Sequence, residues 1–328
     1  MEVLEFIVDS ERIISDRNLF ILIRKNLHNT FLLLGIFGFF FIGCGGERQR
    51  SDIDTINSGT IHISVDESFK PVIDSQIQVF EALNPKAKII AEYKSEGECF
   101  DDLRKDSTRM IIVTRGLTVD EERAYRDSLS YMPKWSKVAN DAIAVIINKE
   151  AKDSTFLLSK LRGVLDGTTA DKELAVFDNL KGSSTLQFME KVILKGRPID
   201  PKKVFGVANS VEVIKYVESH QNVLGFVGVS WIGNSEDTAQ LSFLTRVKIA
   251  SIDCECPDEA FVKPYQANIM RKRYPLVRGL FYILKENYDG LGSGFANFLE
   301  AERGQLIFQR AYLAPALLNF SIRSATLN

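Results

Sequence analysis

The sequence has few of the residues on which most enzyme and metal sites depend. Its 328 residues include 3 histidines and 4 cysteines, and neither a G-x-S-x-G nor an H-E-x-x-H motif occurs. Serine hydrolases need a general base beside the nucleophile, and zinc sites need clustered histidine or cysteine ligands. We therefore expect a protein that is not an enzyme and that holds neither a metal nor a cofactor.

An excess of charge of either sign is also lacking. Lysine and arginine total 41, aspartate and glutamate total 43, and the formal net charge is −2. No broad positive field is available to hold a nucleic acid, so we expect none as a partner. With 45% hydrophobic residues and 9 prolines, the composition is that of a globular protein, and any anionic ligand has to be recognised locally.

The longest uncharged hydrophobic run lies near the N-terminus, at residues 30–43. It follows Arg24 and Lys25, reads TFLLLGIFGFFFIG, and is shorter than the roughly 20 residues of a membrane-spanning helix. A basic region, a short apolar run and a small residue before Cys44 are typical of a signal peptide. An uncleaved anchor helix that starts at about Leu19 is the alternative.

The end of this run resembles the lipobox of bacterial lipoproteins. Phe41-Ile42-Gly43-Cys44 is the matching piece, and the resemblance implies cleavage before Cys44 and attachment of lipid to that cysteine. We therefore predict a lipoprotein-type signal peptide at residues 1–43 and a flexible, polar tether at residues 44–58. The folded part is then anchored to a membrane in the cell envelope and faces the periplasm or the exterior.

Beyond Cys44 the sequence has three cysteines, an odd number that cannot form a complete set of disulfides. Cys254 and Cys256 are separated by a single residue, which is poor geometry for a bridge between them. We expect these two residues and Cys99 to be unpaired, partly buried thiols.

From Gly59 onward, short β-type runs alternate with amphipathic helical runs. Strands are predicted at residues 60–65, 87–93, 109–113, 141–148, 174–177, 202–207, 223–229 and 245–252. Helices are predicted at residues 68–83, 99–106, 119–130, 159–165, 184–194, 211–219, 276–286 and 294–311. This alternation is typical of an α/β fold whose mainly parallel sheets carry helices on both faces.

The alternating elements divide into two units, which predicts two lobes. The chain is expected to cross between them near residues 139–147 and to return near residues 245–252. The first lobe is then discontinuous, with residues 59–140 and 250–328, and the second lobe comprises residues 141–249. Two crossovers of this kind form a hinge, and the cleft between the lobes is the expected ligand site.

Three predicted strand ends run into helix starts and carry residues that suit an anion. At such ends, unpaired backbone N–H groups and the positive end of the helix dipole point at one spot. Ser68 offers a hydroxyl there, although a helix cap alone would also explain it. Gly182 permits close approach of a ligand and Ser183-Ser184-Thr185 supply hydroxyl donors, with a plain glycine–serine loop as the alternative.

The remaining strand end carries Thr114 and Arg115. A guanidinium meets an oxyanion with two parallel hydrogen bonds, which suits arginine better than lysine to this task. The alternative for Arg115 is a salt bridge across the lobe interface to a residue such as Glu96.

Several short segments occur in an order found in a known family of binding proteins. They are Thr114-Arg115 with Leu117-Thr118, DAIAVIIN at 141–148, Leu165-Asp166-Gly167, Gly182-Ser183-Ser184-Thr185, Gly225-Phe226-Val227-Gly228, Tyr274-Pro275-Leu276-Val277-Arg278, and Gly304-Gln305 with Leu313-Ala314-Pro315. Their order from about Thr60 to Ala316 resembles the PstS family, the phosphate-binding subunits of bacterial phosphate ABC importers. The resemblance implies the two-lobed type II periplasmic-binding-protein fold.

By this resemblance, the ligand is phosphate or a similar small oxyanion, held in a closed cleft by hydroxyl and N–H groups. The residues carried over are Ser68, Phe69 through its backbone, Thr114, Arg115, Ser183, Ser184 and Thr185. The implied partners are ABC permease subunits, and the implied protein is a monomer that delivers its ligand to them.

The sequence departs from the family at two places. The family often has an arginine shortly before the serine loop, where this chain has Asp178 and Asn179, and a serine–glycine stretch where this chain has Ser95-Glu96-Gly97-Glu98. A carboxylate repels a fully ionised anion but accepts a hydrogen bond from protonated phosphate, so Glu96 is the candidate acceptor of a ligand proton. Equally, these carboxylates fit a ligand other than phosphate.

Two other functions remain open at this point. A surface lipoprotein that keeps the binding fold but acts as a sensor or scaffold is the first alternative, and the absent arginine favours it. An exported hydrolase is the second and less favoured alternative, because no base is evident near the serine loop.

Overall fold

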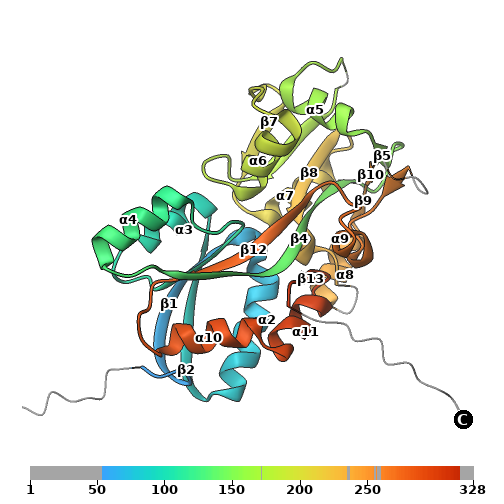
Figure 1. Cartoon of the computed structure of the whole chain (residues 1–328). Helices are drawn as coiled ribbons and strands as arrows, with labels where there is room; N and C mark the ends of the chain where they lie inside the picture. The colour runs from blue at the N-terminus through green and yellow to red at the C-terminus, as the bar shows by residue number, and fades with distance from the viewer. Residues whose placement is uncertain (1–53, 171, 235–236, 255, 257–259, 318–328) are drawn as a thin grey trace, which may run out of the picture. The chain divides into compact units, whose positions relative to one another are not determined.

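The computed structural model describes residues 54–317, apart from residues 171, 235–236, 255 and 257–259 (Figure 1). The predicted signal peptide, the lipidation site at Cys44 and residues 44–53 of the predicted tether lie outside the described residues. Within the described part, no helix is both long enough and apolar enough to span a membrane.

The first lobe begins with three parallel strands, of which β1 is the middle one. Its elements are β1 (Ser58–Asp66), η2 (Glu67–Phe69), α2 (Lys70–Leu83), β2 (Lys86–Lys94), α3 (Glu96–Leu103), β3 (Met110–Val113) and α4 (Val119–Leu129). Side chains alternate along β1, so that Ile61 and Ile63 are buried whereas His62 is exposed. α3 starts in a capping box formed by Ser95 and Glu98, which fixes the loop after β2.

Strand β4 (Lys134–Asn148) carries one hydrogen-bonded sheet through both lobes. Its first part pairs antiparallel with β12 (Val277–Leu284), and its last part, from Ile143 to Ile147, pairs antiparallel with β8 (Val223–Gly228). The order of the sheet is β2-β1-β3-β12-β4-β8-β6-β7. Two short strands, β9 (Val247–Ile249) and β13 (Ala314–Pro315), also pair with β4.

The second lobe repeats the parallel arrangement, with β6 between β7 and β8. Its elements are β5 (Thr155–Phe156), α5 (Leu158–Asp166), β6 (Leu174–Asp178), α6 (Ser184–Phe188), η3 (Met189–Leu194), β7 (Val204–Val207), α7 (Ser210–Ser219), η4 (Val229–Trp231) and α8 (Thr238–Leu244). Phe177 of β6 stacks on Phe226 of β8 with 4.6 Å between ring centroids. This pair belongs to the main apolar core and packs β6 against β8 one residue before Asp178.

The remaining elements lie between β9 and the end of the described chain. They are β10 (Ser251–Asp253), β11 (Phe261–Val262), α9 (Gln266–Met270), α10 (Leu291–Glu300) and α11 (Glu302–Arg310). β10 pairs with β5 and β11 in a small separate sheet.

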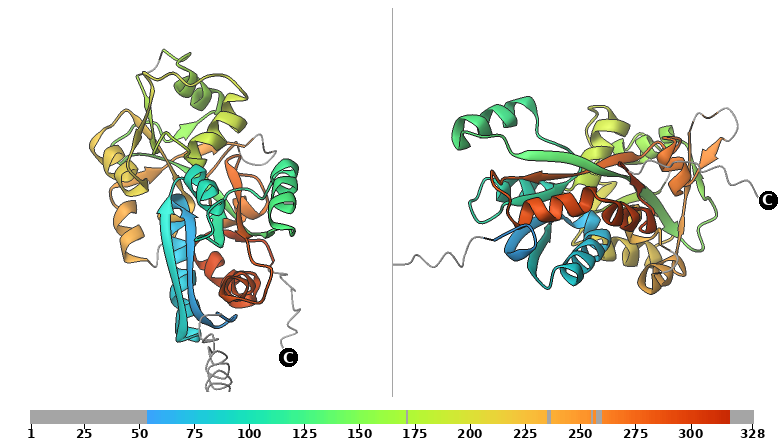
Figure 2. Two further views of the ribbon diagram at one scale, coloured as in Figure 1. Left: turned by 90° about the vertical axis from the view of Figure 1, so that its left-hand side faces the viewer. Right: turned by 60° about the horizontal axis from the view of Figure 1, so that its bottom comes forward.

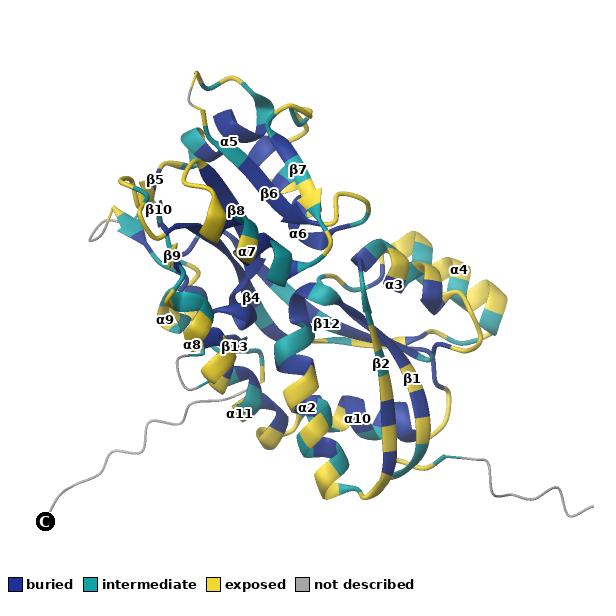
Figure 3. Ribbon diagram, turned by 180° about the vertical axis from the view of Figure 1, so that it is seen from behind, coloured by how far each residue is buried: buried dark blue, intermediate teal, exposed yellow. Residues whose placement is uncertain are grey.

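Helices cover both faces of the sheet in the first lobe, as Figure 1 and the two views of Figure 2 show. On one face, Ile111 and Val113 of β3 pack with Leu103 of α3, whereas the opposite face joins Ile61 and Phe295 in the main core. Figure 3 shows the buried strands between exposed helix surfaces. α4 has no buried residue and stands at the edge of this arrangement.

The predicted two-lobed α/β fold of type II is therefore confirmed. The lobe boundaries stay a prediction, although β10 pairs with β5 and the antiparallel strand that returns to the first lobe is β12. The predicted helix at 294–311 is two helices, α10 and α11, because Ala301 between them has an extended backbone with φ −71° and ψ 161°.

The predicted helix at residues 276–286 is wrong, because this segment forms strand β12. Its sequence, VRGLFYIL, alternates between partly exposed and buried side chains along its first half and is fully buried at its end. The pattern of such a short apolar run is equally compatible with a helix and with a strand. The segment is a strand because it pairs with β3 on one side and with β4 on the other. The correction matters because Arg278 lies on this strand.

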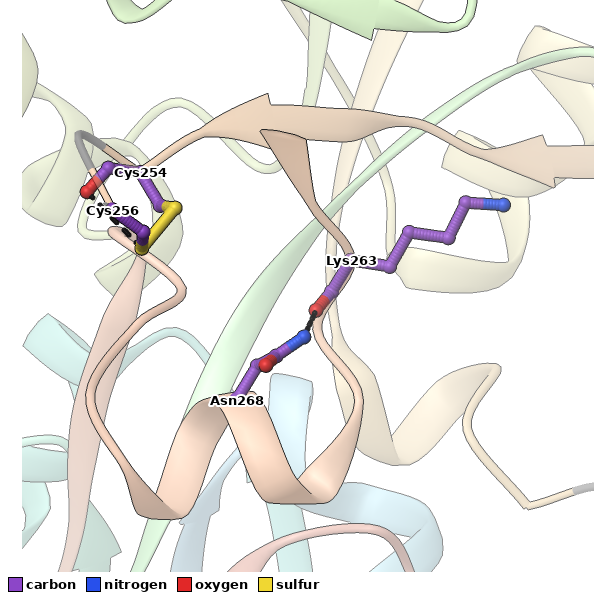
Figure 4. The surroundings of a disulfide bond; sticks show 4 residues. All are labelled: Cys254, Cys256, Lys263 and Asn268. Atoms are coloured by element: carbon purple, nitrogen blue, oxygen red, sulfur yellow. Dashed lines mark hydrogen bonds between the residues drawn. A yellow bond between two sulfur atoms is a disulfide. The ribbon is translucent and has the colours of Figure 1, made fainter. Parts of the chain in front are cut away.

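A second correction concerns the cysteines. Cys254 and Cys256 form a disulfide, with 5.1 Å between their Cα atoms, so the prediction that they are unpaired is wrong (Figure 4). This separation lies within the range of Cα distances that a disulfide spans, although the two cysteines are only two positions apart in the sequence. Asn268 nearby donates a hydrogen bond to the carbonyl of Lys263 at 3.0 Å. Cys99 is free and buried.

Removing this disulfide is expected to change stability only slightly. The bridge closes a loop of very few residues, so it restricts the unfolded chain little, and Cys254→Ser combined with Cys256→Ser should cost less than about 2 kcal/mol. Urea unfolding of the wild type and the double variant measures the difference. A loss above about 3 kcal/mol would show that the bridge supports more than its own turn.

Candidate ligand-binding site

Two strand ends hold hydroxyl groups in place through carboxylates. Asp66, the last residue of β1, accepts hydrogen bonds from the backbone N–H of Ser68 at 3.0 Å and from its hydroxyl at 2.7 Å. Asp178, the last residue of β6, accepts one from the hydroxyl of Ser183 at 3.0 Å. Ser183 in turn caps α6 by accepting from the N–H of Leu186. Each loop is thus ordered by its own acidic residue.

Arg278 joins the two loops at the middle of the molecule. Its Nη2 donates to the hydroxyl of Ser68 at 2.9 Å, and its Nη1 donates to the hydroxyls of Ser184 at 2.9 Å and Thr185 at 3.3 Å. The guanidinium carbon also lies 5.0 Å from the ring centroid of Phe69. Four of the predicted site residues therefore converge on a cation that the sequence analysis did not assign.

Asp141 compensates the charge of this arginine. Its Oδ2 accepts from Nε of Arg278 at 2.9 Å, and both side chains are almost completely buried, at 2% exposure for Arg278 and 0% for Asp141. Burial acts to lower the pKa of Arg278, but the charges of Asp141 and Asp66 outweigh it and raise the pKa. The guanidinium is therefore charged at every pH at which the protein is folded.

Further carboxylates surround this cation. Burial, and then the charges of Asp66 and Glu67, raise the pKa of Asp178 well above its usual value. Burial and the charge of Asp66 likewise raise the pKa of Glu96, against the hydrogen bonds that it accepts from Thr114. Asp66 itself is 1% exposed, and its Oδ2 has no hydrogen-bond partner among the described residues. The site therefore contains a buried, unused acceptor beside the guanidinium.

The third predicted strand end does not join this network directly. The N–H and hydroxyl of Thr114 both donate to Glu96 at 2.6 Å. Arg115 forms a two-point ion pair with Glu121, with distances of 2.8 and 2.9 Å, and lies over the ring of Phe100. Glu121, rather than the predicted alternative Glu96, is thus the salt-bridge partner, and a ligand role for Arg115 stays a prediction.

Loops of the two lobes touch beside the network. The carboxylate of Glu67 accepts from the N–H of Ser210, at the start of α7, and from its hydroxyl at 2.7 Å. The N–H of Gly97 donates to the carbonyl of Gly182 at 3.2 Å. Gly182 has φ +80°, and a Cβ there would lie 3.0 Å from the Ser95 hydroxyl, so glycine is required for this close approach.

A cleft of about 670 Å³ opens next to these contacts. Residues of the first lobe that line it include Glu67, Tyr93 and Lys94. Residues of the second lobe that line it include Asp178, Asn209 and Trp231. The predicted location of the ligand site, between the lobes, therefore coincides with a real cavity that borders the Arg278 network through Glu67 and Asp178.

Sequence reasoning missed Arg278 because it took this segment for a helix. The sequence VRGLFYIL has no alternation of polar and apolar residues, so it carried no signal that would have placed Arg278 on a strand. The segment from Tyr274 to Arg278 was among the pieces that resemble the PstS family, yet only its order in the chain was used.

Comparison with known proteins agrees with this architecture. A family model described as the PBP superfamily domain matches residues 51–303. A substrate-binding protein with bound phosphate from Clostridium perfringens, assigned to a phosphate ABC transporter, is 19% identical with a TM-score of 0.64, covering 79% of this chain and 100% of that chain. An ABC-type phosphate transport receptor from Vibrio cholerae is 16% identical with a TM-score of 0.57, covering 77% and 99%.

A third structure, a possible phosphate binding protein from Planctomyces limnophilus, is 18% identical with a TM-score of 0.52, covering 79% of this chain and 93% of that chain. The search of curated proteins gave no match. At these identities, the solved structures bear on the fold alone. Because the family model spans most of the chain, the chain belongs to the PBP superfamily, and its fold is that of the PstS-like phosphate-binding proteins.

Proposed function

We propose that the protein is a solute-binding protein, not an enzyme, that captures a small oxyanion for an ABC importer, with phosphate as the first candidate. The observation that carries the proposal is the convergence of the hydroxyls of Ser68, Ser184 and Thr185 on the buried guanidinium of Arg278. A desolvated guanidinium with hydroxyl donors around it is a suitable place for a tetrahedral oxyanion. The phosphate-binding names of the similar structures support the same ligand class.

Capture of the ligand would use the hydrogen-bonded pairs around Arg278. When an oxyanion enters, the hydroxyls of Ser184 and Thr185, which now accept from Arg278, turn their O–H groups toward it, and the guanidinium donates to it as well. Asp141 keeps the guanidinium oriented through Nε. The free Oδ2 of Asp66 and the carboxylate of Glu96 can accept a hydrogen bond from an O–H group of the ligand, which favours protonated phosphate over fully ionised sulfate.

Closure of the lobes on the ligand belongs to this proposal. β4 and β12 connect the lobes, and loops such as those of Glu67 and Ser210 meet across the cleft. A ligand that contacts both lobes stabilises their closed arrangement over an open one. The predicted lipid on Cys44 would keep a monomeric protein at the outer face of a membrane, near its permease, by raising its effective concentration.

Calorimetry of the purified full-length protein tests the oxyanion site. We expect phosphate to bind and sulfate to bind more weakly, and Ser184→Ala combined with Thr185→Val to weaken phosphate binding by roughly tenfold or more, since two hydrogen bonds to a charged ligand are lost. Ser219→Ala, which removes a hydroxyl at the far end of α7, is the matched control and should have no effect. Equal phosphate binding by the double variant would place the ligand elsewhere.

A sensor or scaffold that no longer binds an oxyanion is the second candidate. The observation in its favour is that the hydroxyls of Ser68, Ser183 and Ser184 are already paired with side chains of the protein. The same titration decides, because this candidate predicts no heat with phosphate, sulfate, molybdate or any phosphonate.

A further inference from the structure

A second pocket lies on the pair of strands that connects the two lobes. Its volume is about 420 Å³, and its lining includes Lys137 and Asn140 of β4, Lys272 before β12, and Phe281 of β12. Side chains alternate along β12, so Phe281 lies on the opposite face of this strand from the guanidinium of Arg278. The pocket therefore opens on the other face of the strand from the hydrogen-bond network described above.

The uncompensated charges of this pocket are positive. Lys137 and Lys272 are exposed, and neither forms an ion pair with another described residue. Lys137 donates a hydrogen bond to Oδ1 of Asn140 at 3.1 Å, which leaves its charge in place. Arg278 also borders the pocket, but Asp141 compensates its charge. None of the described residues that line the pocket is acidic, so the pocket attracts an anionic group.

The segments that form the pocket also lack acidic residues in the sequence. Neither residues 128–140, which lead into β4 and form its first half, nor residues 260–285, which run through β12, include an aspartate or a glutamate. Their cations are Lys134, Lys137, Lys263, Arg271, Lys272, Arg273, Arg278 and Lys285. In a chain whose formal net charge is −2, these segments are a local concentration of positive charge.

Aromatic surface continues from the pocket along the sheet. The ring centroids of Phe281 and Trp135 are 6.0 Å apart, and Trp135 is 39% exposed. Glu122 of α4 accepts a hydrogen bond from the indole N–H of Trp135 at 3.1 Å and holds this ring in place. A small inorganic anion would contact the lysines alone, whereas a protein segment would cover the aromatic rings as well. Exposed aromatic side chains are typical of the centre of protein–protein interfaces.

We propose that the patch formed by Trp135, Lys137, Asn140, Lys272 and Phe281 binds an acidic segment of a partner protein. Carboxylates of this segment pair with the two lysines, and an apolar side chain of the segment packs on the two aromatic rings. Because the patch lies on β4 and β12, the partner holds the two strands that connect the lobes. This inference does not depend on the oxyanion site.

Tryptophan fluorescence of the full-length protein tests this proposal. The chain has two tryptophans, and Trp231 is only 7% exposed, so Trp135 is the one that a partner can reach. We expect a peptide EEFEE with capped ends to change the emission and to bind at least about tenfold more tightly than a capped QQFQQ peptide. The change should be absent in Trp135→Phe, and a change that persists there would place the peptide elsewhere. No binding of EEFEE, or equal binding of the two peptides, would overturn the proposal.

Charge reversal at the two lysines gives a second readout. Lys137→Glu combined with Lys272→Glu should weaken the binding of EEFEE, measured by calorimetry, about tenfold or more. Lys149→Glu combined with Lys191→Glu is the matched control, because it changes the net charge equally at two exposed lysines that do not line the pocket, and it should weaken binding less than about twofold. Equal weakening by both variants would show attraction by net charge alone and overturn the site. Sedimentation in which the wild type self-associates and the pocket variant does not would make the occupant a second copy, against the proposed partner.

Discussion

Replacing Arg278 with methionine is expected to lower the free energy of unfolding by about 3–5 kcal/mol and to remove oxyanion binding. Methionine keeps much of the length of the side chain but leaves the carboxylate of Asp141, which is fully buried, without its cation. The hydroxyls of Ser68 and Ser184 lose their shared partner as well. Urea unfolding at pH 7 measures the stability, and calorimetry with phosphate measures the binding.

The double variant Arg278→Met with Asp141→Leu separates the structural effect from the binding effect. An internal ion pair that is exchanged for apolar side chains of similar size often costs little, so most of the lost stability should return. Binding should stay absent, because the guanidinium is still missing. Arg123→Met removes an exposed ion pair with Asp120 and should cost less than about 1 kcal/mol. A double variant as unstable as the single one would contradict this account of the pair.

Asp178→Asn is expected to raise the free energy of unfolding at neutral pH. Because burial and nearby carboxylates raise the pKa of Asp178 well above 3.8, the folded protein retains a proton that the unfolded chain has lost. The stability of the wild type therefore falls as the pH rises from about 4 toward the folded pKa, by up to about 1.4 kcal/mol for each pH unit. Asparagine keeps an acceptor for Ser183 and has no such proton, so the gain should vanish below pH 4 and grow above it.

Glu121→Gln provides the control of opposite sign in the same series of urea unfolding curves. The hydrogen bond from Arg115 lowers the pKa of Glu121 to about 2, so its ionised form stabilises the folded state. That stabilisation is present above the usual glutamate pKa and is lost as the pH falls toward 2. This variant should therefore be less stable than the wild type at pH 7. An Asp178→Asn protein less stable than the wild type at pH 7 would contradict the buried-acid interpretation.

The parts of the site that were predictable from sequence are those with local causes. Ser68 and Ser183 each follow a strand end and stand at the start of a helical turn, and both patterns are visible within a few residues. The position of Arg115 also has a local cause. Glu121, six residues later, lies in the first turn of α4 and forms an ion pair with the guanidinium of Arg115. The sequence therefore already contained, within seven residues, the carboxylate that pairs with Arg115.

The role of Arg278 could not be predicted from the sequence, because its contacts are made with residues that are distant along the chain. Its partner Asp141 is directly opposite it in the pairing of β12 with β4, and the two residues are far apart in the sequence. The sequence of neither strand shows this register, because a buried run such as VRGLFYIL contains no local feature that determines which strand it pairs with.

The change of partners along β4 bears on how the lobes can move. At Ala142 the strand is still paired with Val277 of β12, and at Ile143 it is already paired with Gly228 of β8. The N–H of Ile143 also donates to the carbonyl of Leu276 at 2.9 Å, so the exchange of partners is bridged by a hydrogen bond. If the lobes close on a ligand as proposed, we expect β4 to twist at this exchange. Because Asp141 directly precedes Ala142, the carboxylate that orients the guanidinium of Arg278 lies beside this exchange, and a ligand bound at Arg278 would act on the backbone at that place.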